Sequence, residues 1–132
     1  MAFLDSMQQD KIYLIGVSAG GTVVLNALAE RPQKIAKVAT ICSPYRHFSH
    51  PIRSLLEQSI DRLIPNLERI DATTKTKVLS LHAAYDQTVP PSMSTVPGIS
   101  TKRMLTIRHG LSIGAALTIY SRTIRRFFSS QI

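Results

Sequence analysis

The sequence predicts an α/β protein built on a parallel sheet of about four strands, with helices packed on its faces. Short, nearly continuous apolar runs, typical of strands buried on both faces, alternate with segments whose apolar residues recur every three or four positions. Strands that alternate with helices favour parallel pairing through right-handed crossovers. The length of 132 residues suits one domain, so we expect residues 1–132 to form a single unit.

The first half of the chain predicts two strands and three helical segments. Proline lacks the N–H that a helix interior needs, so Pro32 and Pro65 are interpreted as helix ends. In chain order we expect the last turns of a helix (2–8), a strand (Lys11–Val17), a helix (19–30, with Val23, Val24, Ala27 and Leu28 on its apolar face), a strand (Ile35–Cys42) and a helix that starts near Ser49 and stops at Pro65.

The second half predicts two more strands and one long helix. The strands are expected at Lys77–Leu81 and Arg103–Ile107, separated by a proline-containing loop over 87–100 with room for one helical turn. The apolar residues that follow recur at helical spacing and predict one continuous C-terminal helix, its face formed by Ile113, Leu117, Tyr120, Ile124 and Phe127.

Composition excludes some classes of protein. No apolar stretch approaches the ~20 residues of a membrane span, and the N-terminus lacks the pattern of a signal peptide, so we expect a cytoplasmic location. Cys42 is the only cysteine, so the chain forms no internal disulfide, which is compatible with a reducing compartment. The net charge of +8 is scattered and not interleaved with aromatic residues, so a nucleic-acid or anionic-surface binder is the weakest hypothesis and no nucleic-acid partner is expected.

Three residues with catalytic chemistry follow the predicted strands. Ser18 comes directly after the first strand, Asp86 shortly after the third, and His109 after the fourth. In a parallel sheet, the carboxyl ends of the strands lie at one edge, where ligands bind. A serine hydroxyl becomes a good nucleophile when a histidine takes its proton, and a carboxylate orients that histidine.

Ser18 stands among glycines, with Gly16 two residues before it and Gly20 and Gly21 after it. A nucleophile on a sharp strand-to-helix turn requires small residues two positions before and two positions after it. We therefore interpret Gly16, Gly20 and Gly21 as residues of such a turn, although a plain glycine-rich turn has the same composition.

These segments together resemble the α/β-hydrolase family of serine esterases and lipases. The matching pieces are GVSAGG at 16–21, HAAYDQTVP at 82–90, RHG at 108–110 and the strand and turn VATICSPYR at 38–46, with Ser, Asp and His in the family's order. The resemblance implies that Ser18 is the nucleophile, His109 the general base, Asp86 its orienting acid, and the Ala19 N–H an oxyanion donor. It also implies a small-molecule acyl ester as substrate, and neither a metal nor another cofactor is expected.

The resemblance covers nearly all of this chain but only the C-terminal half of the family's pattern. Only 17 residues precede Ser18, so we expect a truncated three-layer sandwich, a partial domain that lacks the loop supplying the family's second oxyanion donor. The strand Lys11–Val17, interior in the family, becomes an edge strand here. An exposed apolar edge invites pairing, so we expect self-association or a companion chain at Lys11–Val17. The alternative function is therefore a non-catalytic, hydrolase-like interaction module that needs a partner chain.

Overall fold

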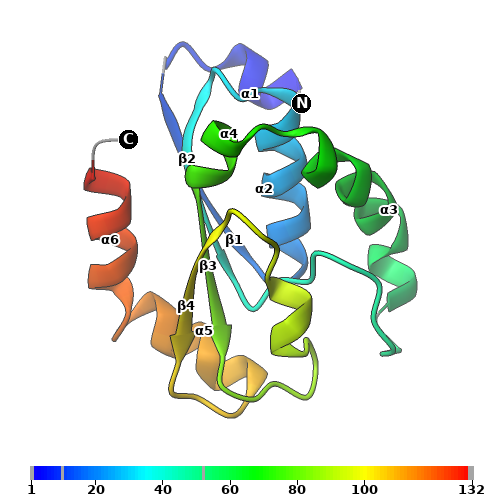
Figure 1. Cartoon of the computed structure of the whole chain (residues 1–132). Helices are drawn as coiled ribbons and strands as arrows, with labels where there is room; N and C mark the ends of the chain where they lie inside the picture. The colour runs from blue at the N-terminus through cyan, green and yellow to red at the C-terminus, as the bar shows by residue number, and fades with distance from the viewer. Residues whose placement is uncertain (1, 10, 52, 131–132) are drawn as a thin grey trace.

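The computed structural model describes residues 2–9, 11–51 and 53–130 (Figure 1). Its sheet has four parallel strands in the order β1-β2-β3-β4, which confirms the predicted fold class. The strands are β1 (Ile12–Val17), β2 (Ile35–Ile41), β3 (Val78–Ala83) and β4 (Ser100–Met104). The helices are α1 (Ala2–Ser6), α2 (Ala19–Glu30), α3 (Arg53–Arg69), α4 (Ala72–Thr76), the 3-10 turn η1 (Pro91–Ser94), α5 (His109–Leu117) and α6 (Ser121–Ser129).

The helices cover both faces of the sheet, so the molecule has three layers. On one face, Leu25 and Leu28 of α2 and Leu63 of α3 pack against strand residues that include Val38 and Val78. On the other face, Ala116 of α5 and Ile124 of α6 pack with Ile41, Leu81 and Met104. Figure 1 shows these two groups of helices on opposite sides of the strands.

Helix α3 continues past Pro65 to Arg69, so the predicted stop at Pro65 is wrong. The residues after Pro65 gain tertiary contacts that offset the missing N–H. Leu67 is buried against the core, and the buried Asn66 side chain donates to Asn26 Oδ1 of α2 at 2.9 Å. The start predicted near Ser49 is also early, because the helix begins at Arg53. Ile52, the first residue of the predicted apolar face, lies outside the described residues.

Strand β4 lies three residues before its predicted position. It ends at Met104, and the next large apolar residues, Leu105 and Ile107, are exposed in the loop that follows. The strand itself reads Ser-Thr-Lys-Arg-Met, and its first four residues are exposed. An edge strand of this composition has no apolar run for sequence analysis to detect.

Two helical predictions also need correction. The C-terminal helix is not continuous but divides into α5 and α6, and the Tyr120 hydroxyl at the junction accepts a hydrogen bond from the Leu105 N–H at 3.1 Å. Helix α2 has its predicted bounds, but Val23 is 60% exposed and does not belong to the buried face.

Strand β1 is at an edge of the sheet, as the sequence predicts. It pairs only with β2 within the described sheet, in parallel register from Ile12–Ile35 to Val17–Ile41. On this strand Tyr13 is 48% exposed and Ile15 is 46% exposed. The opposite edge, β4, instead carries the exposed charges of Lys102 and Arg103, a composition that discourages pairing between sheets.

Candidate active site

The sharp turn between β1 and α2 presents Ser18 at the carboxyl end of the sheet. Ser18 has φ 48° and ψ −120°, a backbone conformation that costs a residue with a side chain about 1–3 kcal/mol. The surrounding structure holds it there: the Ser18 N–H donates to Ile41 O at 2.8 Å, and its carbonyl accepts from the Gly21 N–H at 3.0 Å. The strain is therefore fixed by the first two strands and the first turn of α2.

At this turn, Gly16 and Gly21 are the glycines packed too closely against neighbouring atoms to carry a side chain. A Cβ at Gly16 would lie 2.6 Å from Gly20 O and 2.6 Å from the Val24 side chain, and a Cβ at Gly21 would overlap the Ser43 side chain. A Cβ at Gly20 would meet no atom of the described residues within 4 Å. The prediction that Gly20 must be small is wrong for this chain, because space is open there.

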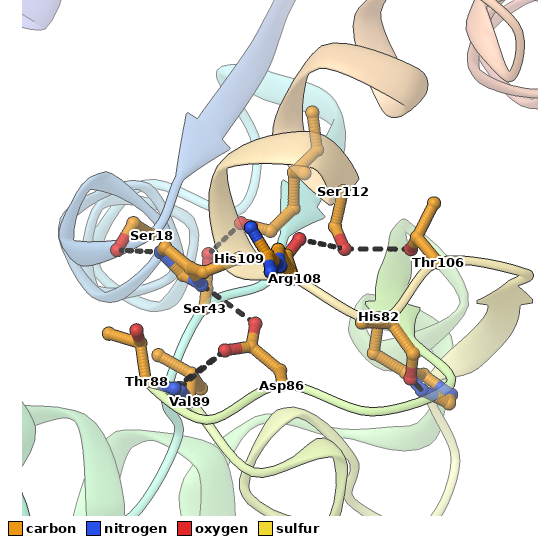
Figure 2. A network of polar contacts seen from close by, with 12 residues as sticks. Ser18, Ser43, His82, Asp86, Thr88, Val89, Thr106, Arg108, His109 and Ser112 are labelled. Carbon is orange, nitrogen blue, oxygen red and sulfur yellow. Dashed lines mark hydrogen bonds and ion pairs between the residues drawn. The ribbon is translucent and has the colours of Figure 1, made fainter.

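The structure brings Ser18, Asp86 and His109 together, although they are far apart in sequence (Figure 2). His109 Nε2 lies 3.0 Å from Ser18 Oγ, and His109 Nδ1 lies 2.7 Å from Asp86 Oδ2. With the proton on Nδ1, the ring donates to Asp86 and its Nε2 accepts from the Ser18 hydroxyl. This tautomer is the one that a general base at Nε2 requires.

Asp86 is held by its own loop. Its Oδ1 accepts from the backbone N–H groups of Thr88 at 2.8 Å and Val89 at 3.0 Å, which leaves Oδ2 for His109. The side chain of Asp86 is 1% exposed and that of His109 is 16% exposed. The carboxylate is thus oriented by three donors while the imidazole keeps access to the surface.

A second set of hydrogen bonds fixes the turn that carries His109, and sequence analysis did not identify it. The fully buried Ser112 donates through its hydroxyl to Arg108 O at 2.7 Å, and its N–H donates to the same carbonyl at 2.8 Å. The Ser112 hydroxyl also lies 2.7 Å from Thr106 Oγ1. Ser112 therefore links the end of the β4 loop to the first turn of α5, on which His109 is the first residue (Figure 2).

Cys42 is a further neighbour that sequence analysis left as a free thiol. The Cys42 thiol, an Asp86 carboxylate oxygen and a His109 ring nitrogen all lie within 4.8 Å of one another. Burial, together with the negative charge of Asp86, raises the pKa of the Cys42 thiol to about 11. A protonated thiol is a poor metal ligand, and Asp86 and His109 are already bonded to each other, so the set is better suited to a hydrogen-bonding network than to a metal. Cys42 directly follows β2, and the strand-end rule that identified Ser18 could have found it.

The other histidines and acidic residues singled out by sequence lie elsewhere. His47 Nε2 contacts Asp61 at 2.8 Å on the surface, and His82 lies on β3 with its Nδ1 3.1 Å from Ala83 O. Asp71 caps α4 by accepting from the Thr74 N–H at 2.6 Å. Hydrogen bonding to the Thr74 side chain and to this N–H lowers the pKa of Asp71. In the described part of the chain, no helix has both the length and the apolar character needed to cross a bilayer.

Comparison with known proteins identifies the family. The model of the alpha/beta hydrolase fold family matches residues 2–74, more than half of the chain. The chain belongs to the α/β-hydrolase fold family. The matched segment contains the Ser18 turn, whereas Asp86 and His109 lie beyond it. No curated protein sequence matches the chain.

Solved structures extend the likeness across the chain. They include a meta-cleavage product hydrolase from Pseudomonas fluorescens (TM-score 0.63, 14% identity, covering 96% of this chain and 67% of that one). A serine hydrolase from Cycloclasticus zankles has a TM-score of 0.62 at 13% identity, with 98% and 69% coverage. A structure from the metagenome-derived lipolytic enzymes LipS and LipT has a TM-score of 0.66 at 12% identity, with 98% and 70% coverage. This α/β-hydrolase therefore spans about two thirds of the length of these chains.

Proposed function

We propose that this α/β-hydrolase cleaves carboxylic esters, with Ser18 as nucleophile, His109 as general base and Asp86 as orienting acid. The observation that carries the proposal is the unbroken series of hydrogen bonds from Ser18 Oγ to His109 at 3.0 Å and from His109 to Asp86 at 2.7 Å. The strained backbone of Ser18 supports it, since strain of this kind is found at functional sites.

The reaction would proceed in two halves. Ser18 Oγ attacks the ester carbonyl carbon while its proton passes to His109 Nε2, and the resulting imidazolium is stabilised by Asp86. His109 then gives that proton to the departing alkoxide, which leaves an acyl group on Ser18. In the second half His109 takes a proton from water, the hydroxide attacks the acyl carbon, and the acid is released as Ser18 regains its proton.

The oxyanion that forms in each half needs donors. The Ala19 N–H is the proposed first donor, because Ala19 begins α2 and a helix offers no acceptor of its own to its first N–H groups. In the family that the sequence resembles, a second oxyanion donor is supplied by a loop that has no counterpart in these 132 residues. Loss of one such donor lowers the rate of a serine hydrolase by about 10²–10³. We therefore expect slow turnover by this chain alone.

An apolar cluster beside the nucleophile favours an apolar acyl group. Ala19, the neighbour of Ser18, packs against a cluster formed by Phe48, Leu56, Ile60 and Val89. Val89 also belongs to the loop that holds Asp86, so the cluster borders both ends of the site. One structural neighbour is described as lipolytic enzymes, which agrees with this substrate class, and another as a serine hydrolase, which agrees with a serine nucleophile.

Hydrolysis of p-nitrophenyl esters tests the proposed function. Release of p-nitrophenolate should be measurable with the wild-type chain, should vary with acyl length, and should fall to the buffer rate in the Ser18→Ala variant. Equal release by both proteins would refute Ser18 as the nucleophile. Ser92→Ala, the same change at an exposed serine of η1, serves as the matched control and should retain activity.

The second candidate function, a non-catalytic module that needs a partner chain, is favoured by the uncovered β1 edge. Tyr13 and Ile15 are about half exposed there, and the chain spans about two thirds of its structural neighbours. Ile15→Lys should shift the chain toward monomer in analytical ultracentrifugation, because a charge on an edge strand opposes pairing. Thr101→Lys, at an exposed position of the opposite edge strand β4, is the control. Identical sedimentation of wild type and Ile15→Lys would argue against an interface at β1.

A further inference from the structure

Five large apolar side chains are exposed beside the loop that carries His109. Leu105 is 87% exposed, Ile119 77%, Ile107 65%, Leu111 64% and Tyr85 62%. Single exposed apolar residues are common on soluble proteins, but a gathered set marks an interaction surface. We call this set the apolar rim.

Hydrogen bonds between segments hold the rim together as one surface. The Tyr85 N–H donates at 3.2 Å to Thr106 O, the residue between Leu105 and Ile107. The Leu105 N–H donates at 3.1 Å to the hydroxyl of Tyr120, which adjoins Ile119. Figure 1 shows the loop after β3, the loop after β4 and the start of α5 together at the carboxyl end of the sheet. The rim therefore occupies one end of the molecule.

The part of the chain that forms most of the rim is strongly basic. From residue 87 to the C-terminus there is no Asp or Glu, and the cationic residues are Lys102, Arg103, Arg108, Arg122, Arg125 and Arg126. All six are exposed, and they lie on β4, on the loop that follows it and on α6, the elements that border the rim. Each basic residue near an anionic bilayer strengthens partitioning roughly fivefold.

We propose that the apolar rim and its basic border dock onto an anionic lipid surface, a class of partner that the sequence alone ranks last because its charge is scattered along the chain. Aliphatic side chains flanked by guanidinium and ammonium groups suit the boundary between headgroups and acyl chains, where the apolar part inserts and the cations contact phosphates. Four of the five rim residues are leucine or isoleucine. Proteins bind single-stranded nucleic acid by stacking aromatic side chains on its bases, so an aliphatic surface is poorly suited to that partner.

Docking in this orientation indicates a substrate class for the proposed ester hydrolysis, and this inference rests on that proposed function. Leu105, Ile107 and Leu111 lie within four residues of His109, so the surface that contacts lipid is the surface that carries the general base. Ester bonds of membrane lipids lie at that boundary. The substrate class that follows is the lipid ester, delivered from the bilayer rather than from solution.

Vesicle sedimentation of the full chain tests the proposal, with the Ser18→Ala variant so that no hydrolysis occurs. The protein should sediment with vesicles of phosphatidylcholine and phosphatidylglycerol, much less with phosphatidylcholine alone, and less as salt is added. Leu105→Ser with Ile107→Ser should lower partitioning by about tenfold or more. The matched control is Phe3→Ser with Val23→Ser, two side chains that are 75% and 60% exposed outside the rim, and it should bind like the parent.

Three results would overturn the proposal: no preference for anionic vesicles, equal binding after the rim substitutions, or an equal loss in the Phe3 and Val23 control. Lys102→Gln with Arg103→Gln tests the basic border separately and should weaken binding to anionic vesicles alone. Thermal unfolding of each variant shows that the fold persists. Binding is measured without catalysis, so the two proposals can fail separately. Vesicle binding without ester hydrolysis would refute the proposed function and leave the docking surface intact. Ester hydrolysis without vesicle binding would refute the docking surface and leave the proposed function intact.

Discussion

At the scale of single residues, the conformation of Ser18 depends on how closely β1 and α2 approach each other on either side of it. Gly16 contacts α2 so closely that an added methyl group would lie within 2.7 Å of three of its atoms. Gly21 faces the buried side chain of Ser43, which lies two residues after the end of β2. The turn is therefore built by backbone packing, and its glycines are not equivalent.

Substitution of the three glycines by alanine should separate them. Gly16→Ala and Gly21→Ala should each lower the free energy of unfolding by about 1–3 kcal/mol, because a methyl group is forced into occupied space. Gly20→Ala should be neutral or stabilise α2 by up to about 1 kcal/mol, since alanine is the better helix former and the space is open. Urea denaturation measures all three. A loss at Gly20 equal to that at Gly16 would contradict this packing.

Cys42 should give the stability of the protein a dependence on pH. Its thiol has an ordinary pKa of 9.0, and burial raises the pKa to about 11 in the folded chain. Between these values the unfolded chain has lost the proton that the folded chain retains, so the free energy of unfolding falls as pH rises from 9 to 11. The loss attributable to Cys42 should be about 2 kcal/mol.

Comparison with Cys42→Ala isolates that contribution from the lysines and tyrosines that ionise over the same range. The variant should lose less stability than wild type between pH 9 and pH 11 in urea denaturation. The ultraviolet absorbance of the thiolate should appear in the folded wild type only near the upper end of that range. Parallel stability losses in the two proteins would show that the thiol ionises equally in both states.

At the scale of elements, α3 shows how tertiary contacts override a local signal. Pro65 is exposed inside the helix and leaves the Asp61 carbonyl without its usual donor. Pro65→Ala should raise the free energy of unfolding by about 1–3 kcal/mol, and thermal unfolding should show a higher Tm. Glu68→Ala, an exposed change in the same helix, should leave Tm nearly unaltered. A fall in Tm for Pro65→Ala would mean that the proline shapes the packing of Asn66 and Leu67.

The elements that sequence predicts well are those whose signals are local. β1, α2 and β2 lie within one residue of their predicted bounds, because a buried apolar run, a glycine turn and a proline stop are all contained in the segment itself. The helix break at 118–120 and the end of β4 are instead joined by a hydrogen bond between Leu105 and Tyr120, which belong to two separate segments. The spacing of apolar residues within either segment cannot predict a contact between the two segments.

At the scale of the whole molecule, the candidate site was predictable because a parallel sheet collects its strand ends. Ser18, Asp86 and His109 follow three different strands, and topology alone brings them to one edge. Their supporting residues were not predictable in the same way. Ser112 acts through a carbonyl and a threonine hydroxyl, a relation that has no sequence motif. The position of Cys42 after β2 was open to the strand-end rule, but its proximity to Asp86 was visible only in the structure.

The central claim is that Ser18 is an activated nucleophile in this partial α/β-hydrolase chain. Intact-mass analysis after treatment with a fluorophosphonate tests it most directly, because the probe reports activation of the serine without requiring turnover. The account predicts a single covalent adduct on the wild-type chain, much slower labelling of His109→Ala, and no adduct on Ser18→Ala. An unlabelled, folded wild type, or an adduct that persists in Ser18→Ala, would contradict it.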